Sequence, residues 1–176
     1  MKERLHRAGW LFMVILFVAT SIGIGVYAFW QNTHPSPAQQ TTNQNNCQFQ
    51  QVSAPTLTAP EVYKPAGAAT QLQITDLQVG SGQAVQSGDC VTTKYYGTLA
   101  SDGTVFDEDF TNPTALQFSL GQGQVIPGWD EGLIGMKVGG LRRLVIPPSL
   151  AYGSQAQGKI PANSTLVFVV KLISVK

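Results

Sequence analysis

The sequence predicts an α+β domain in which an antiparallel β-sheet packs against one short helix. Two observations support this class. Segments rich in β-branched and aromatic residues recur through the C-terminal two thirds of the chain, separated by glycine-containing turns. A single amphipathic helical segment interrupts them, and strands on both sides of one helix are typical of α+β domains.

The strands follow from local composition and alternation. Residues 90–99 favour β structure, and Asp102-Gly103 is a strong turn signal between Leu99 and Val105. The other expected strands cover residues 72–79, 105–106, 116–120, 141–147 and 165–174. In the last strand Leu166, Phe168, Val170 and Leu172 share one face, whereas Val167, Val169 and Ile173 form an apolar outer face that the segment before residue 70 could cover.

The helix is expected to begin near Trp129, directly after Pro127-Gly128. Asp130 and Glu131 would lie in its first turn, where carboxylates complement the helix dipole. Gly139-Gly140 are expected to end it.

The N-terminal region predicts a membrane anchor. Residues 8–30 carry no Lys, Arg, Asp or Glu, and a helix of this length spans about 34 Å, enough for a bilayer core. Basic residues flank segment 8–30 only on its N-terminal side, within residues 1–7. Residues 1–7 are therefore expected in the cytoplasm, and the chain after residue 30 outside the membrane. The rival interpretation is a signal peptide cleaved near Ala19-Thr20-Ser21, which would release a secreted protein.

Residues 31–69 are interpreted as a flexible linker followed by an extended lead-in, and residues 70–176 as the folded domain. The Gln/Asn/Thr/Pro tract that opens the linker has no apolar periodicity. Cys47 follows this tract and Cys90 opens a strand. On the outer face of a membrane they can form a disulfide, which would pin the lead-in to the domain; the alternative is two unpaired thiols.

Composition excludes several functions. A formal net charge of +1 gives no electrostatic case for nucleic acid. The two histidines, His6 and His34, precede the domain, so a Ser-His-Asp or Cys-His mechanism has no base there. The acidic run Asp107-Glu108-Asp109 lacks calcium-ligand spacing and is interpreted as a solvated loop. No metal or cofactor is expected.

A set of aromatic residues with few polar partners points to an apolar pocket, and its segments occur in the order of a known family. These are Tyr95-Tyr96-Gly97-Thr98-Leu99, Asp102-Gly103-Thr104-Val105-Phe106-Asp107, Phe118-Ser119-Leu120-Gly121, Val125-Ile126-Pro127-Gly128-Trp129, Met136-Lys137-Val138-Gly139, Ala151-Tyr152-Gly153 and Ile160-Pro161. Over about residues 70–176 the chain resembles the FKBP-type peptidyl-prolyl cis–trans isomerases. The resemblance implies a half-barrel sheet wrapped around the helix.

The resemblance also implies roles for single residues. Trp129 would form the pocket floor, and Asp107 would be a buried carboxylate that organises the pocket. The Ile126 N–H and the Tyr152 hydroxyl would each hold a substrate carbonyl. The apolar walls and substrate contacts would come from Tyr95, Phe106, Phe118, Val125 and Phe168.

The function implied is rotation about Xaa-Pro bonds of proteins folding outside the membrane, by an enzyme that is monomeric and needs no cofactor. Proline-containing polypeptides are the implied substrates, and a macrolide immunosuppressant is an implied ligand. Leu116, Asn112 and Gln124 depart from residues frequent in the family, and they bear on macrolide affinity and turnover. Two alternatives remain: a holdase or adaptor that binds proline peptides without turnover, and a purely structural tethered β domain.

Overall fold

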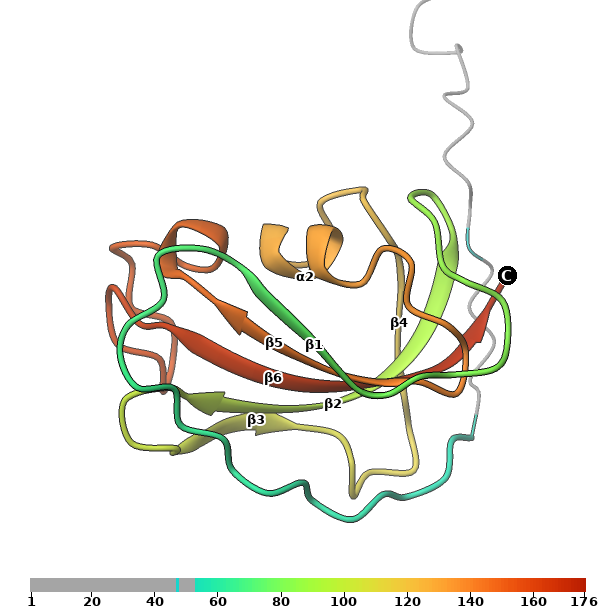
Figure 1. Ribbon diagram of the computed structural model, residues 1–176, viewed down its shortest axis with the longest axis horizontal. Helices are drawn as coiled ribbons and strands as arrows, with labels where there is room; N and C mark the ends of the chain where they lie inside the picture. The colour runs from blue at the N-terminus through green and yellow to red at the C-terminus, as the bar shows by residue number, and fades with distance from the viewer. Residues whose placement is uncertain (1–46, 48–52) are drawn as a thin grey trace, which may run out of the picture. The chain divides into compact units, whose positions relative to one another are not determined.

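The computed structural model describes Cys47 and residues 53–176, which belong to one compact unit (Figure 1). The expected cytoplasmic segment 1–7, membrane segment 8–30 and linker residues 31–46 lie outside the described residues. Within the part that is described, no helix is both long and apolar enough to cross a membrane.

The described residues form a six-stranded antiparallel sheet, as the sequence predicted. The strand order is β1-β5-β6-β2-β3, and β4 pairs with β2 beside β3. The strands are β1 (Gln73–Gln78), β2 (Cys90–Leu99), β3 (Val105–Glu108), β4 (Leu116–Ser119), β5 (Leu141–Ile146) and β6 (Leu166–Val175). The expected strand boundaries differ from these by at most a few residues.

Strand β2 organises the sheet because it pairs along both edges. On one edge it runs antiparallel to β6, from Val91 opposite Val175 to Leu99 opposite Leu166. On the other edge its first half pairs with β4 and its second half with β3. The loop of residues 109–115 therefore leaves the sheet edge at the middle of β2 and returns to it.

The single α-helix of the described residues, α2 (Pro127–Gly132), is shorter than the sequence predicted. The expected end at Gly139-Gly140 was wrong because residues after Leu133 pair with a neighbouring loop instead. The Gly135 N–H donates to Val85 O at 2.9 Å, and Gly135 has φ of +74°, which is outside the helical region. A 3₁₀ turn, η2 (Pro148–Leu150), follows β5.

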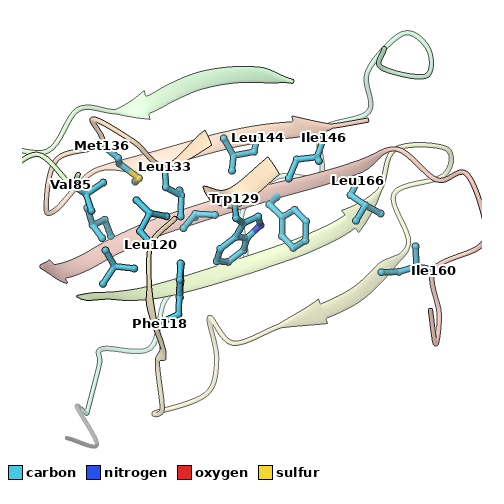
Figure 2. Close-up of a cluster of buried hydrophobic side chains, with 14 of the residues drawn as sticks. Val85, Phe118, Leu120, Trp129, Leu133, Met136, Leu144, Ile146, Ile160 and Leu166 are labelled. Atoms are coloured by element: carbon cyan, nitrogen blue, oxygen red, sulfur yellow. The ribbon is translucent and has the colours of Figure 1, made fainter. Parts of the chain in front are cut away.

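The core lies between the concave face of the sheet and α2 (Figure 2). Strand β6 contributes the face that the sequence predicted. Its residues Leu166, Phe168, Val170 and Leu172 are all buried in this core. Trp129 lies at the centre of the cluster and is 3% exposed. The indole of Trp129 thus lies between α2 and the sheet, and the same side chain also lines the apolar pocket.

Arg142 on β5 fixes the C-terminal end of α2. Its Nη1 donates to Gly132 O at 2.9 Å and to Ile134 O at 3.0 Å, which satisfies carbonyls that the helix itself leaves unpaired. Its Nε and Nη2 donate to the two carboxylate oxygens of Asp76 on β1. This buried guanidinium therefore joins the helix to the edge of the sheet.

The lead-in packs on the sheet face opposite α2 (Figure 1). Tyr63 covers a small cluster that includes Val145 and Val167, and the Arg143 guanidinium lies 3.6 Å from the centre of its ring. The Ala69 N–H donates to the Thr165 hydroxyl at 3.1 Å. The prediction that this segment covers the outer face of the last strand is confirmed for Val167.

Cys47 and Cys90 form a disulfide, with Cα atoms 5.6 Å apart, so the disulfide alternative is confirmed. The main chain of Cys90 also exchanges two hydrogen bonds with Lys176, the last residue of the chain. The disulfide therefore attaches the lead-in to β2 at the point where Lys176 pairs with that strand.

Removing the disulfide should destabilise the domain. The two cysteines are 43 residues apart, and closing a loop of this length restricts the unfolded chain by about 4 kcal/mol. A Cys47→Ser/Cys90→Ser chain is therefore expected to show a free energy of unfolding about 3–4 kcal/mol lower in urea titrations. The reduced wild type serves as the control and should match it; a loss below about 1 kcal/mol would contradict the expectation.

Candidate active site

A cavity of about 240 Å³ opens beside the core cluster, and almost every predicted site residue lines it. Strands, helix and loops all contribute to its walls. The lining residues are Tyr95, Phe106, Asp107, Leu116, Gln124, Val125, Ile126, Trp129, Tyr152 and Phe168. These residues come from β2, β3, β4, β6, α2 and two loops, so only the folded chain brings them together.

The aromatic rings at this site pack edge to face. The Trp129 and Phe168 ring centres are 5.2 Å apart at 89°, and Tyr95 lies 5.5 Å from Trp129 at 78°. Phe106 packs on Phe168 in the same way, at 5.4 Å and 83°. Such pairs gain from the ring quadrupoles beyond their buried area. They make a rigid apolar floor and wall of a size suited to a small ring.

Gly97 on β2 permits this arrangement. A Cβ atom at this position would lie 2.7 Å from Phe106 Cζ and 2.9 Å from Phe168 Cε1. Both rings therefore occupy the space that any larger residue would need. The close approach of these rings to the strand explains a glycine within the middle of a β-rich segment.

The Tyr95 hydroxyl donates a hydrogen bond to Asp107 Oδ2 at 2.6 Å. Burial, the hydrogen bond and the charge of Asp107 raise the pKa of Tyr95 far above its ordinary value, so the hydroxyl keeps its proton at neutral pH. Asp107 itself is exposed on β3. The expectation of a buried carboxylate at this position was wrong: the acid stands at the rim, where it faces both solvent and the pocket.

Ile126 and Tyr152 each present a polar group at the cavity. Ile126 is the N-cap residue of α2, and its carbonyl accepts the Trp129 N–H at 2.9 Å. Among the described residues, none accepts a hydrogen bond from the Ile126 N–H. Tyr152 is 37% exposed and follows η2, where the Ala151 and Gly153 N–H groups both donate to Pro148 O. Main-chain turns therefore fix the Ile126 N–H and the backbone that carries the Tyr152 side chain.

One predicted contact residue lies elsewhere. Phe118 is buried on β4, with its ring centre 5.8 Å from that of Trp129, and it does not line the cavity. It supports the indole from within the core. Leu116 and Gln124 line the cavity in its place, and the Gln124 side chain accepts the Ser119 N–H at 2.9 Å. Alternation along β4 placed Leu116 and Phe118 on one face, but it could not tell which of them reaches the opening.

Sequence reasoning missed a buried acid two residues after Asp107. Asp109 is 8% exposed, and its carboxylate accepts the Tyr95 N–H at 2.5 Å and the Leu116 N–H at 3.3 Å. Its position in an acidic run suggested solvent, so composition held no signal for this role. Burial raises the pKa of the Asp109 carboxyl, while the Tyr95 N–H, the Lys94 charge and the Leu116 N–H act in the opposite direction.

A second, larger cavity of about 480 Å³ lies between the lead-in and the turns at residues 100–101 and 161–165. Its walls are small residues and main chain, and no aromatic ring lines it. The Thr165 hydroxyl at its edge is already bonded to the Ala69 N–H. The smaller cavity is the better candidate site because it combines an aromatic floor with directed polar groups.

The fold and the pocket define a half-barrel domain whose described residues line an apolar cavity of a size suited to a small ring. Among the described residues, no cluster of three His, Cys, Asp or Glu side chains could hold a metal ion. The model of the family described as FKBP-type peptidyl-prolyl cis-trans isomerase matches residues 81–173. The chain belongs to this family.

Relatives and solved structures agree with this assignment. The chain is 47% identical over 119 residues to the FK506-binding protein of Streptomyces anulatus, covering 66% of this chain and 96% of that one. It is 53% identical over 105 residues to FK506-binding protein 4 of Chaetomium thermophilum. That match covers 58% of this chain but spans only 21% of the fungal protein.

Two solved structures share the fold. The crystal structure of AtFKBP13 aligns with a TM-score of 0.56 at 35% identity, covering 62% of this chain and 96% of that one. FkpA from Escherichia coli aligns with a TM-score of 0.55 at 46% identity, covering 62% and 51% of the two chains. An FKBP-like antiparallel sheet with one short helix is therefore confirmed.

The raised pKa of Asp109 predicts a pH-dependent stability. A carboxyl that binds its proton more tightly in the folded chain contributes most to stability below its ordinary pKa of 3.8, and this contribution is lost as pH rises through the folded value. The free energy of unfolding of wild type, minus that of Asp109→Asn, should therefore fall as pH rises from 3 to 7. Urea titrations of both chains across this pH range test the prediction, because the contributions of all other titratable groups cancel in the difference. A difference in the free energy of unfolding that rises with pH would contradict it.

Proposed function

We propose that this chain catalyses rotation about Xaa-Pro peptide bonds in folding polypeptides, at the pocket floored by Trp129. The observation that supports this most is the edge-to-face cluster of Tyr95, Trp129 and Phe168. It offers an apolar surface for a proline ring, with the Asp107 carboxylate at its edge. The Ile126 N–H and the Tyr152 hydroxyl also lie there, and neither has a hydrogen-bond partner among the described residues.

The chemistry needs no covalent intermediate. Partial double-bond character gives the peptide bond a rotation barrier of roughly 18–20 kcal/mol. Twisting the bond removes the conjugation, so the nitrogen becomes pyramidal and the carbonyl less polar. An apolar floor disfavours the charge-separated planar form, and it therefore binds the twisted amide better than either ground state.

The polar groups would hold the substrate while its bond turns. The Ile126 N–H would donate to the carbonyl that follows proline, and the Tyr152 hydroxyl to a second carbonyl. Asp107, positioned by the Tyr95 hydroxyl, would face the carbonyl that rotates. Fixed donors of this kind cost no reorganisation during the reaction.

The same pocket would accept a macrolide of the FK506 type. The relatives of this chain in Streptomyces anulatus and Chaetomium thermophilum are named FK506-binding proteins. A ring held over Trp129 would occupy the position proposed for proline, so such a ligand should compete with peptide substrates.

Conservative changes at the two rim groups test the mechanism. Tyr152→Phe and Asp107→Asn alter exposed side chains, so both chains should fold, yet each removes one proposed interaction with the substrate. Loss of one hydrogen bond of about 1–1.5 kcal/mol predicts a roughly tenfold lower kcat/KM for each variant. NMR exchange spectroscopy on a short Xaa-Pro peptide, with the full chain purified in a mild detergent, measures the rate.

Tyr63→Phe is the matched control, because Tyr63 lies on the opposite sheet face and should leave the exchange rate unchanged. Circular dichroism establishes that each variant is folded. Peptide binding by wild type without faster exchange would mean a holdase or adaptor, and it would remove the catalytic roles of Asp107 and Tyr152. Neither binding nor acceleration would leave a structural domain.

We also propose that the domain works outside a membrane, anchored by residues 8–30. The uncharged apolar composition of that segment and the basic residues before it support this orientation. The Cys47–Cys90 disulfide supports an oxidising compartment, where such bonds persist.

Protease protection tests the location. In spheroplasts of a bacterial host, the full chain should remain with carbonate-washed membranes, and protease added outside should digest the domain. A chain lacking residues 8–30 is the control and should be protected inside the cell. Recovery of the domain in the soluble outer fraction would favour the cleaved signal peptide, and protection from protease would contradict an outer location.

A further inference from the structure

Lys94 on β2 is buried completely, although lysine is rarely found without solvent contact. Its neighbour Tyr95 lines the pocket, so alternation along the strand directs Lys94 to the opposite face. There its ammonium donates to three main-chain carbonyls: Asp109 O at 2.9 Å, Thr114 O at 3.0 Å, and Asn112 O. An ammonium has three donors, and all three are used.

The three carbonyls belong to the loop that joins β3 to β4. This loop has some contacts of its own: the Asn112 N–H donates to Asp109 O, and the Thr114 N–H and hydroxyl both donate to Asn112 Oδ1. Lys94 binds carbonyls at both ends and at the middle of the loop. Lys94 therefore holds the loop at three points, while the lead-in adds two main-chain bonds, from the Leu57 N–H to Phe110 O and from the Ala54 N–H to Pro113 O.

The Asp109 carboxylate connects this loop to the pocket. It accepts N–H groups from Tyr95 and Leu116, both of which line the cavity. Asp107 lies on β3, and Asp109 is the first residue of the loop that follows this strand. A displacement of the loop would therefore move the rim carboxylate and the Leu116 wall together.

Burial of the Lys94 charge is costly unless oxygen atoms compensate it, and the loop supplies them. The carbonyl dipoles and the nearby Asp109 carboxylate do so only when the loop has its observed conformation. The ammonium thus favours the observed loop conformation, because another would leave the buried charge of Lys94 without its oxygen partners.

We infer that Lys94 is a positioning residue for the pocket. It holds the loop of residues 109–115 so that Asp107 and Leu116 lie where the substrate binds. The inference rests on the proposed function of this pocket. Lys94 touches no substrate in this scheme and acts only through the loop. Its effect should therefore appear in the rate of turnover and in the positions of Asp107 and Leu116.

Lys94→Met tests this, because methionine keeps much of the side-chain volume and removes the charge and donors. In the folded variant we expect kcat/KM for Xaa-Pro exchange to fall at least about tenfold, since small misplacements of site groups carry losses of this order. The amide NMR signals of Asp107 and Leu116 should shift in the same chain. Full-length protein is used throughout.

Lys171→Met is the matched control. Lys171 lies directly opposite Lys94 on β6, and its ammonium donates to one main-chain carbonyl, Gly139 O at 2.6 Å, away from the pocket. It should change neither the rate nor the signals of Asp107 and Leu116. A folded Lys94→Met chain with a rate within twofold of this control would overturn the inference.

If Lys94→Met does not fold, Lys94→Arg decides. Arginine keeps the charge, but its planar donors cannot match three carbonyls that converge on one point. A lower rate with shifted Asp107 and Leu116 signals supports positioning, and an unchanged rate overturns it. Failure of the proposed function is distinguishable, because wild type itself would then not accelerate exchange, while the signal shifts would still report on the loop.

Discussion

The packing of one indole between a short helix and the concave face of the sheet supports the whole domain. A helix of six residues has little stability of its own, so α2 depends on tertiary contacts. It lies so close to the sheet that a Cβ atom at Gly128 would approach Ile146 Cγ2 to 2.4 Å, and one at Gly132 would approach Leu144 Cδ2 to 2.8 Å. The glycines allow the contact, and Trp129 fills the space that remains.

Core and pocket are consequently one structure. Trp129 is a core residue on one side and the pocket floor on the other, and the rings of Phe118 and Phe168 both pack against its indole. Around this apolar centre, two buried cations perform similar tasks on different elements. Arg142 fixes the end of the helix through main-chain carbonyls, and Lys94 fixes the loop beside β3 in the same way. Charges in the interior thus set the geometry of a site that is itself mostly apolar.

Sequence patterns were most informative where a residue's own chemistry determines its place. Alternation in β6 identified its buried face, and the Asp102-Gly103 turn has Gly103 at φ of +80°. Sequence patterns were least informative where tertiary contacts determine the structure. The helix stops early because residues after Leu133 pair with another loop, and Asp109 is buried because the neighbouring strand β2 supplies a partner, the Tyr95 N–H. Neither Lys94 nor Asp109 could be recognised without knowing which loop folds over which strand.

The disulfide gives the domain a defined mechanical attachment. A pull on the chain before Cys47 passes through the sulfur atoms directly into Cys90, the first residue of β2. The covalent loop between the two cysteines, including β1, is thereby bypassed and carries little of the tension. The force arrives at the strand that pairs with β3, β4 and β6, beside the end of the chain at Lys176. The disulfide thus keeps the lead-in on the sheet when force is applied to the chain on the N-terminal side of Cys47.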